Sequence, residues 1–261
     1  MALVETTPLE AGVSRPAARR HGTHRMPAHH RPVITALPAE RSALGQCGWL
    51  ASHRRRVTAP GVAYRCTKRS IDIALVLLVG LVALPVALAC AAAVKLDDPT
   101  GPVLFRQQRT GRGGKRITIH KFRSMCVDAE ARKAELMALN LRDGPDFKVE
   151  HDPRITRVGR WLRKLSLDEI PQLWDVLAGR MSLVGPRPTS MAPDVYEPWQ
   201  MERFDVMPGL TGLWQVGGRS SSSFNERIRL DISYCTRRSL RLDLAIIART
   251  VPVVIFGKGS W

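Results

Sequence analysis

The longest apolar stretch of the chain runs from residue 73 to residue 94 and contains no charged side chain over its 22 residues. Lys68, Arg69 and Asp72 precede it, and Lys95 follows it directly. A helix of about 20 apolar residues crosses the hydrocarbon core of a bilayer. We therefore expect a membrane-inserted helix. The alternative, a helix buried in a soluble core, is disfavoured by so long a run of Ala, Leu and Val.

Pro85 lies near the middle of this stretch. It has no backbone N–H, so it removes a helix hydrogen bond and kinks or breaks the helix. Basic residues occur on both sides of the stretch, and basic flanks are retained on the cytosolic face of a membrane. This combination favours a re-entrant helix-break-helix over residues 67–96 that enters and leaves by the same face. A kinked helix that crosses the bilayer is the alternative.

The rest of the chain predicts an α/β domain, mostly helical, over residues 97–261. Two β-prone runs, residues 102–108 and 116–122, flank a glycine-rich segment and predict a β-hairpin. The glycine spacing does not match the eight-residue phosphate-binding loop. Residues 128–139 are rich in Ala, Glu and Lys and predict a helix.

Two further segments have the pattern of helices at a membrane interface. Residues 155–165 place apolar side chains at helical spacing with four cations between them, which favours an amphipathic helix in the headgroup layer. An ordinary surface helix is the alternative. Residues 240–256 are also apolar but contain Asp243, Arg249 and Pro252, so their uncharged runs are too short to span a bilayer. They predict an interfacial or core helix.

The chain is strongly basic, with 40 Lys and Arg against 23 Asp and Glu and a net charge of +17. This balance favours phosphates, nucleic acid or anionic lipid as partners. Residues 1–66, rich in Ala, Pro, Arg and His, have no sustained apolar period and predict a disordered basic leader without a secretion signal. The five cysteines are scattered, which indicates reduced thiols in a cytosol-facing protein.

Asp168 and Glu169 form an adjacent carboxylate pair behind Arg163 and ahead of an apolar helical pattern. Ser166 and Glu169 have the spacing of a capping box, which would place both carboxylates on the first turn of a helix. The positive end of the helix dipole keeps a carboxylate there ionised, as a carboxylate nucleophile requires. The second carboxylate could hold a divalent cation beside phosphates.

Four cations surround this pair in the sequence, and together they point to phosphoryl transfer: Lys121, Arg123, Arg163 and Arg187. Arg187 lies between two prolines, on a stiff backbone suited to a fixed phosphate contact.

Four segments of the chain resemble the bacterial sugar transferases, the monotopic phosphoglycosyl transferases that begin exopolysaccharide, capsule and glycan assembly. They are Lys121-Phe-Arg-Ser-Met125, Ser166-Leu-Asp-Glu-Ile-Pro-Gln172, Met181-Ser-Leu-Val-Gly-Pro-Arg-Pro188 and Pro208-Gly-Leu-Thr-Gly-Leu-Trp-Gln-Val216. The resemblance covers residues 68–261. It implies a re-entrant membrane helix that anchors a small cytosolic catalytic domain at the bacterial plasma membrane.

The resemblance also implies a reaction and its residues. The enzyme would move a sugar-1-phosphate from a UDP-sugar to undecaprenyl or another polyprenyl phosphate. Asp168 would attack the sugar-bearing phosphorus, release UMP and form a phosphosugar-aspartyl intermediate, while Glu169 would help Asp168 to hold Mg²⁺. Phosphate-contacting positions match Lys121, Arg163 and Arg187, and Arg219 matches a position near the nucleotide-sugar pocket. A hexose such as glucose or galactose is the sugar that the resemblance implies.

The sequence departs from the family's pattern in two places. Leu84-Pro85 stands where the family has Ser-Pro at the helix break, and only the basic leader precedes the core, so the chain resembles the family's minimal form. Two other functions are compatible with the residues alone. One is a non-catalytic, membrane-anchored scaffold for anionic lipid or nucleic acid, although the family resemblance implies no nucleic-acid partner. The other is a glycosyl transferase that releases UDP.

Overall fold

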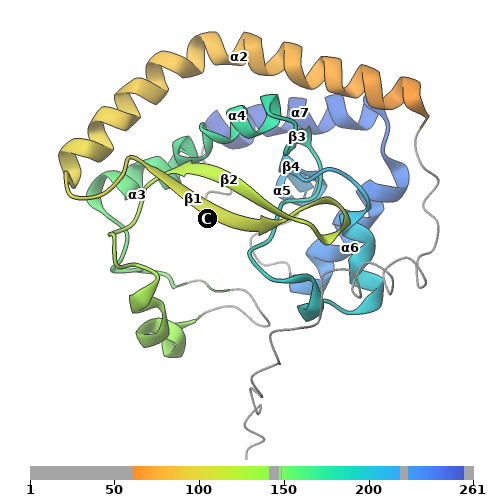
Figure 1. Cartoon of the computed structure of the whole chain (residues 1–261). Helices are drawn as coiled ribbons and strands as arrows, with labels where there is room; N and C mark the ends of the chain where they lie inside the picture. Colours follow the sequence, from red (N-terminus) through yellow and green to blue (C-terminus); the bar gives the residue numbers. More distant parts are fainter. Residues whose placement is uncertain (1–60, 141–146, 148, 218–222, 256–261) are drawn as a thin grey trace, which may run out of the picture. The chain divides into compact units, whose positions relative to one another are not determined.

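The computed structural model describes residues 61–140, 147, 149–217 and 223–255. All of them belong to one compact unit, residues 41–261. Nearly all of the predicted basic leader, and Arg219, lie outside the described residues. The unit is mostly helical and contains two small two-stranded sheets, β1–β2 and β3–β4 (Figure 1).

The predicted anchor is one continuous helix, α2 (Val62–Asp97), and not two helices separated by a break. Pro85 lies inside it, and Figure 1 shows α2 bending along its length while the helix continues. Proline removes one hydrogen bond, but the flanking turns keep theirs, so a kink is enough to accommodate it. Re-entrant topology therefore stays a prediction.

Most of the apolar surface of α2 faces away from the protein. Among the described residues α2 is the one helix long and apolar enough to cross a membrane, and only 11% of its most apolar window is buried. Leu81 and Val82 are 76% and 72% exposed, whereas Val76 and Val94 are buried against the rest of the unit. A helix with so large an exposed apolar face is typical of membrane insertion.

Polar contacts fix the N-terminal part of α2 to the rest of the unit. Lys68 Nζ lies 2.9 Å from Asp243 Oδ2, and Arg69 donates to the carbonyl oxygens of Val176 and Leu177 at 2.6 and 2.7 Å. Asp72 accepts from Ser182 Oγ at 2.7 Å. Because these partners lie on three different elements, the orientation of the helix is fixed from several sides.

The predicted hairpin is confirmed as β1 (Leu104–Thr110) paired antiparallel with β2 (Arg116–Phe122). The turn between them contains a short 3-10 segment, η1 (Arg112–Gly114), in which Gly113 and Gly114 have φ of 66° and 75°. Glycine adopts this left-handed conformation without the steric cost that a Cβ imposes. The glycines therefore build a turn and not a phosphate loop.

The helices after the hairpin are shorter than the sequence predicts. The predicted helix 128–139 is a 3-10 helix, η2 (Ala131–Leu139), and the basic amphipathic helix is α3 (Arg157–Lys164). The acidic pair lies on η3 (Leu167–Glu169), one 3-10 turn ahead of α4 (Gln172–Leu177).

The capping box predicted at Ser166 and Glu169 is wrong. Ser166 has φ of 55° and its side chain makes no capping hydrogen bond, while its backbone N–H donates to Arg163 O at 3.1 Å, at the end of the preceding helix. Glu169 binds cations from other elements instead of the Ser166 N–H. Tertiary contacts have overridden the local pattern.

The C-terminal part surrounds a short parallel pair, β3 (Ser182–Val184) and β4 (Gly209–Thr211). A Cβ on Gly185 would lie 2.3 Å from Met207 O, so only glycine permits this close approach of the loop that carries Arg187. The remaining elements are η4 (Pro193–Val195), η5 (Pro198–Asp205), α5 (Leu213–Gly217), α6 (Phe224–Arg237) and α7 (Leu240–Ile255).

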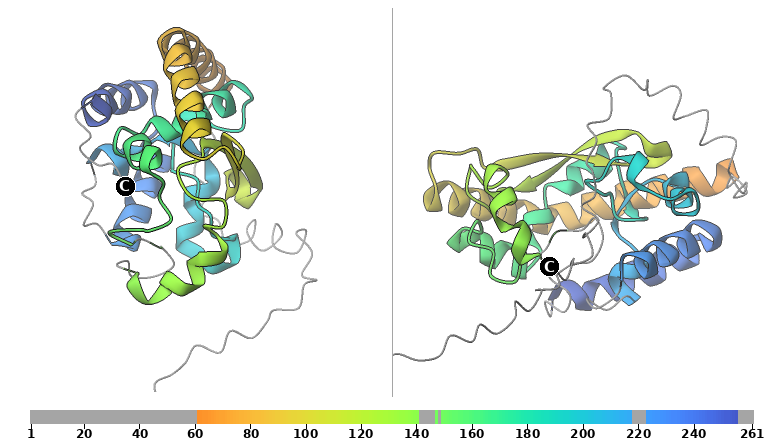
Figure 2. Two further views of the ribbon diagram at one scale, coloured as in Figure 1. Left: turned by 90° about the vertical axis from the view of Figure 1, so that its left-hand side faces the viewer. Right: turned by 90° about the horizontal axis from the view of Figure 1, so that it is seen from below.

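The second apolar stretch is confirmed as a helix, α7, which packs Ile246 against Val184 and Tyr234. Its outer face exposes Leu244, Val251 and Val254. Figures 1 and 2 show α2 and α7 on the same side of the unit, as two separate helices. Two partly apolar helices therefore share the side on which the anchor lies.

Candidate active site

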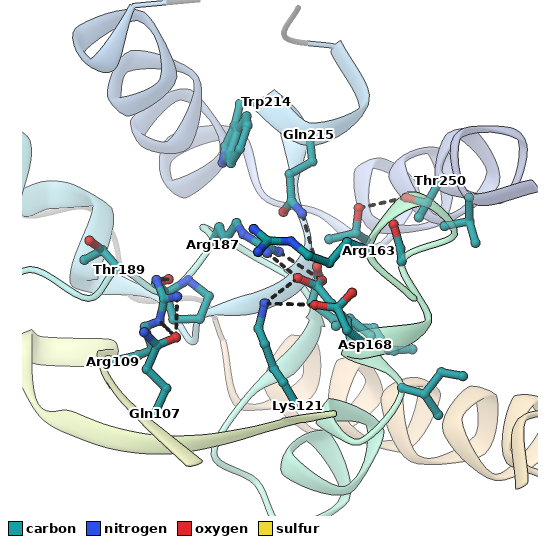
Figure 3. A pocket seen from close by; sticks show the side chains of 18 of the residues that line it. Gln107, Arg109, Lys121, Arg163, Asp168, Arg187, Thr189, Trp214, Gln215 and Thr250 are labelled. Carbon is teal, nitrogen blue, oxygen red and sulfur yellow. Dashed lines mark hydrogen bonds and ion pairs between the residues drawn. The ribbon is translucent and has the colours of Figure 1, made fainter. Parts of the chain in front are cut away.

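Five of the residues that the sequence singled out line one cavity of about 830 Å³: Lys121, Arg163, Asp168, Glu169 and Arg187. They come from the end of β2, from α3, from η3 and from the loop after β3. Figure 3 shows Lys121, Arg163, Asp168 and Arg187 converging from these separate elements. The fold thus gathers a carboxylate pair and three cations that are up to 66 residues apart in the sequence.

Glu169 is held by two cations. Lys121 Nζ donates to Glu169 Oε1 at 2.8 Å, and the Arg187 guanidinium binds both carboxylate oxygens, with Nη1 3.1 Å from Oε2. Burial alone would raise the pKa of Glu169, but Arg187 and Lys121 outweigh burial and hold the pKa well below its usual range. Glu169 is therefore an ionised, fixed anchor for Lys121 and Arg187.

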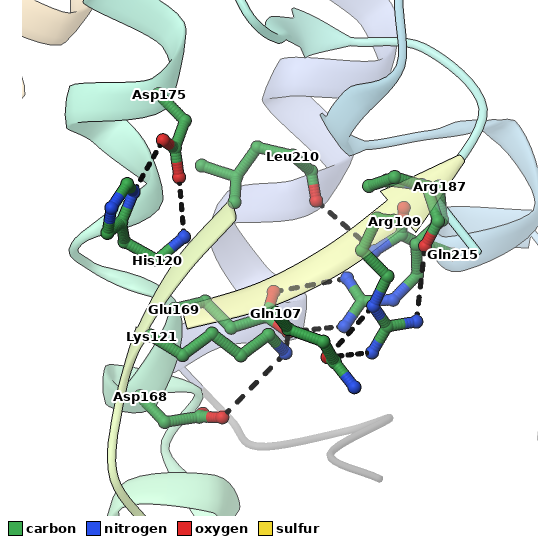
Figure 4. Close-up of polar contacts among 11 residues, drawn as sticks. Gln107, Arg109, His120, Lys121, Asp168, Glu169, Asp175, Arg187, Leu210 and Gln215 are labelled. Carbon is green, nitrogen blue, oxygen red and sulfur yellow. Dashed lines mark hydrogen bonds and ion pairs between the residues drawn. The ribbon is translucent and has the colours of Figure 1, made fainter. Parts of the chain in front are cut away.

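Asp168 has a different environment from its neighbour. It is buried, and within the described part of the chain its carboxylate accepts no hydrogen bond; Lys121 Nζ lies 4.0 Å from Oδ2. Burial raises the pKa of Asp168 above its ordinary value, and the charge of Glu169 adds to this effect, while Lys121 opposes it. Figure 4 shows the Asp168 carboxylate reaching toward Lys121 from outside the Glu169 cluster. An anionic oxygen with so few partners is available as a nucleophile or a ligand.

The pKa values of Lys121 and Arg187 shift in opposite directions in this cavity. Burial lowers the pKa of Lys121, and the attraction of Glu169 offsets this only in part because Arg187 repels it. For Arg187, Glu169 outweighs burial and raises the pKa. Among the residues that line the cavity, Lys and Arg outnumber Asp and Glu, as expected of a site for a polyanion.

Two predicted residues do not join this group. Arg123 is 6% exposed and lies outside the cavity, where its guanidinium pairs with Asp98 and donates to Asp98 O and Gly101 O. It follows the last residue of β2 and fastens the connection after α2, which is a structural role. Arg219 falls outside the described residues. Pro85 lies within α2, which contributes Leu75, Val79 and Ala83 to the cavity wall.

The structure adds residues that the sequence reasoning missed. Arg109 and Gln107 of β1, and Gln215 of α5, line the same cavity. A signal for the first two was available, because antiparallel pairing places opposite residues on one face of a hairpin. The register pairs Gln107 with Ile119 and Phe105 with Lys121, so Gln107, Arg109 and Lys121 share a face.

The carboxylates fit a magnesium ion only in part. No group of three or more His, Cys, Asp or Glu side chains among the described residues could hold a metal. Mg²⁺ binds one or two carboxylates and completes its shell with water and phosphate oxygens. Asp168 suits that role, whereas both oxygens of Glu169 are already engaged by Lys121 and Arg187.

The comparison with curated proteins gives several clear matches. The chain is 42% identical over 197 residues to a galactosyl transferase, CpsE, of Streptococcus agalactiae, covering 74% of this chain and 43% of that protein. It is 39% identical over 209 residues to an undecaprenyl-phosphate galactose phosphotransferase of Salmonella typhimurium, covering 76% of this chain and 42% of that protein. The chain therefore spans less than half the length of these relatives.

A third relative is matched over most of both chains. This protein of Caulobacter vibrioides, a UDP-glucose:undecaprenyl-phosphate glucose-1-phosphate transferase, is 41% identical over 224 residues, with 81% of this chain and 78% of that protein covered. A family model described as bacterial sugar transferase matches residues 63–257, which include α2, the hairpin and the whole cavity. With all four quoted segments inside that range, the chain belongs to the bacterial sugar transferase family.

Proposed function

We propose that this protein transfers a sugar-1-phosphate from a UDP-sugar to undecaprenyl phosphate, the first membrane step of polysaccharide assembly. The observation that carries the proposal is the contrast between the two adjacent carboxylates. Glu169 is neutralised by Lys121 and Arg187, whereas Asp168 is buried in the same cationic cavity and accepts no hydrogen bond from any described residue. This arrangement supports one positioning carboxylate and one reactive carboxylate.

In the proposed mechanism an Asp168 oxygen attacks the sugar-bearing phosphorus of the UDP-sugar. A new P–O bond forms, the bond from this phosphorus to the bridging oxygen breaks, and UMP leaves. A phosphate oxygen of undecaprenyl phosphate then attacks the same phosphorus and releases Asp168. Lys121, Arg163 and Arg187 line the cavity and would stabilise the charge on the transferred phosphate, since cations fixed near developing charge stabilise it strongly.

We include Mg²⁺ in the proposal, and Asp168 would hold it together with the substrate phosphates. When bound it supplies charge neutralisation at the diphosphate. Glu169 would become a second ligand only by releasing one of its cations. In this assignment Asp168 is the main protein ligand of the metal, whereas the sequence resemblance implies that Asp168 and Glu169 hold it together.

The lipid substrate is supported by apolar residues that line the cavity, here called its apolar half: Leu75, Val79 and Ala83 of α2 and Val251 and Val254 of α7. Val79, Val251 and Val254 are also 50%, 52% and 44% exposed, so the apolar wall is continuous with the outer surfaces of both helices. A polar nucleotide sugar gains nothing from such a wall, whereas an isoprenoid chain does. We propose that α2 inserts into the plasma membrane from the cytosolic side and that the rest of the unit lies in the cytosol.

The proposal predicts UMP release from membranes that contain the full chain. Membrane fractions supplied with undecaprenyl phosphate, Mg²⁺ and a panel of UDP-hexoses should release UMP with at least one sugar, and EDTA should stop the release. The product nucleotide is identified by chromatography. Release of UDP would instead indicate a glycosyl transferase, and lipid binding without any nucleotide product would indicate a scaffold.

The apolar wall gives a separate prediction. Val251→Trp should narrow the apolar half and slow transfer to undecaprenyl phosphate about tenfold, which corresponds to about 1.4 kcal/mol. UMP release in a single turnover without lipid should stay near the wild-type rate, because the polar half is unchanged. Leu244→Trp is the matched control, since Leu244 is equally exposed on α7 but does not line the cavity. Equal slowing by both variants would contradict the assignment of the wall.

A further inference from the structure

Arg109 is a half-buried cation in the wall of the cavity. Its Nε and Nη2 donate to Gln107 Oε1 at 2.9 and 2.5 Å, and its Nη1 donates to Pro188 O at 3.4 Å. No described carboxylate lies within ion-pair distance of it. Arginine has five N–H groups, so two of them are left for another acceptor. Figure 4 shows Gln107 against one edge of the Arg109 guanidinium.

The three fully buried arginines among the described residues are each paired with an acid. Arg154 binds Asp152 at 2.6 Å, Arg203 binds Asp231 at 2.7 Å, and Arg123 binds Asp98. Such pairing is expected, because a guanidinium removed from water without an anion is unfavourable. Arg109 is half-buried and has no such pair among the described residues, and it lies in the wall of the cavity, where an anion can enter.

The surroundings of Arg109 disfavour its positive charge as long as no anion is bound. Burial lowers its pKa to about 10, and the positive charge of Arg187 contributes to the decrease. Glu169 is the carboxylate that attracts it, but that carboxylate is already bound by Lys121 and Arg187. A bound phosphate would relieve both the desolvation of Arg109 and its repulsion by Arg187.

Backbone contacts hold Arg109 in this position. Thr110 N donates to Thr189 O at 2.7 Å, and Thr110 Oγ1 donates to Met191 O at 2.6 Å. These bonds fasten the end of β1 to the loop that carries Arg187, two residues before Thr189. Figure 3 shows Arg109, Gln107 and Thr189 grouped to one side of Lys121 and Asp168. The site is therefore rigid and lies beside the reactive carboxylate, at a different part of the cavity.

We propose that Arg109, braced by Gln107, binds the nucleoside-side phosphate of the nucleotide diphosphate, the one that leaves as UMP. This rests on the proposed function, in which the sugar-bearing phosphorus lies at Asp168. The second phosphate of the diphosphate is joined to the sugar-bearing phosphate by one bridging oxygen. It therefore needs a cation of its own, close to Lys121 and Arg163. Arg109 would bind this phosphate in the intact UDP-sugar and again in free UMP, and would stabilise the negative charge that develops on it as the bond to the bridging oxygen breaks.

The test is equilibrium binding of UMP to the full-length protein in detergent, measured by titration calorimetry at fixed ionic strength. Arg109→Met should weaken UMP binding about tenfold to a hundredfold, the effect of losing a charged hydrogen bond. Arg109→Lys should bind UMP more tightly than Arg109→Met but more weakly than the wild type. Lysine keeps the positive charge but lacks the paired N–H groups of the guanidinium. Gln107→Leu should weaken binding less than Arg109→Met, as a positioning residue does.

Arg106→Met is the matched control, because Arg106 is an exposed arginine on the same strand whose partner in the register is His120, on the opposite face from Lys121. It should bind UMP as the wild type does. Thermal unfolding of each variant checks that the fold is intact. UMP affinity of Arg109→Met equal to wild type, or equally reduced by Arg106→Met, would overturn the assignment.

The same preparation separates this inference from the proposed function. If the wild type binds UMP in an Arg109-dependent way but releases none from any UDP-sugar, the phosphate site stands and the transferase proposal fails. If UMP is released normally while Arg109→Met changes neither UMP affinity nor the KM for UDP-sugar, the transferase proposal stands and the Arg109 assignment fails.

Discussion

Asp168→Asn is expected to abolish UMP release and the covalent phosphosugar-enzyme adduct while the protein stays in the membrane fraction. Asparagine keeps the shape of the side chain but has no anionic oxygen to attack phosphorus. Loss of a catalytic nucleophile costs about 10⁴-fold or more in rate. The measurements are UMP release by chromatography and the mass of the intact protein after incubation with UDP-sugar alone.

The same substitution should make the folded protein more stable. The Asp168 carboxylate is buried without a hydrogen-bond donor among the described residues, and burial raises its pKa, so its ionised form is disfavoured in the folded state. Replacing it with a neutral amide should stabilise the fold by about 1 kcal/mol, or about 2–4 °C in Tm. If its replacement stabilises the fold and stops the reaction, Asp168 serves catalysis and not folding.

Asp194→Asn is the control for both effects, because Asp194 is an exposed carboxylate on η4 away from the cavity. It should change neither UMP release nor Tm. Full turnover by Asp168→Asn would contradict the nucleophile assignment. An inactive but less stable variant would instead show that Asp168 supports the fold.

Local pattern was sufficient to predict the elements whose residues interact mainly with sequence neighbours. The hairpin, α3 and α7 were recognised in this way, because strand alternation, glycine turns and helical spacing are local signals. The residues gathered at the cavity were recognised for a different reason. Lys121, Arg163 and Arg187 are of the type that phosphate chemistry needs, and each lies in a segment that resembles the family.

The errors arose where a distant partner decides the outcome. Arg123 follows Lys121 by two residues, but β2 ends at Phe122 and Asp98 captures the guanidinium, so only Lys121 reaches the cavity. Glu169 fits a capping box, but two cations offer it stronger contacts than the Ser166 N–H does. Arg109 was missed because the feature that marks it is the lack of a carboxylate partner among the described residues. That lack can be recognised only in the folded structure.

Glu169→Gln is expected to have the second-largest effect, on stability as well as on activity. The substitution removes the only carboxylate within hydrogen-bond distance of Lys121 and Arg187 among the described residues, since Asp168 lies 4.0 Å from Lys121. Breaking a buried ion pair by removing one partner costs about 3–5 kcal/mol, and we expect about 3 kcal/mol because the pair borders the cavity. UMP release should fall at the same time, because both cations lose their fixed positions.

The pH dependence of this loss identifies its cause. Because the pKa of Glu169 lies below its usual value in the folded protein, its stabilisation is fully present above the ordinary glutamate pKa and is lost as the pH falls toward the folded-state value. The difference in Tm between wild type and Glu169→Gln should therefore be largest at neutral pH and shrink in acid. Glu135→Gln, at an exposed position on η2, should leave Tm unchanged. If Glu169→Gln matches the wild type in Tm at neutral pH, the cations are held by other contacts and Glu169 does not organise the site.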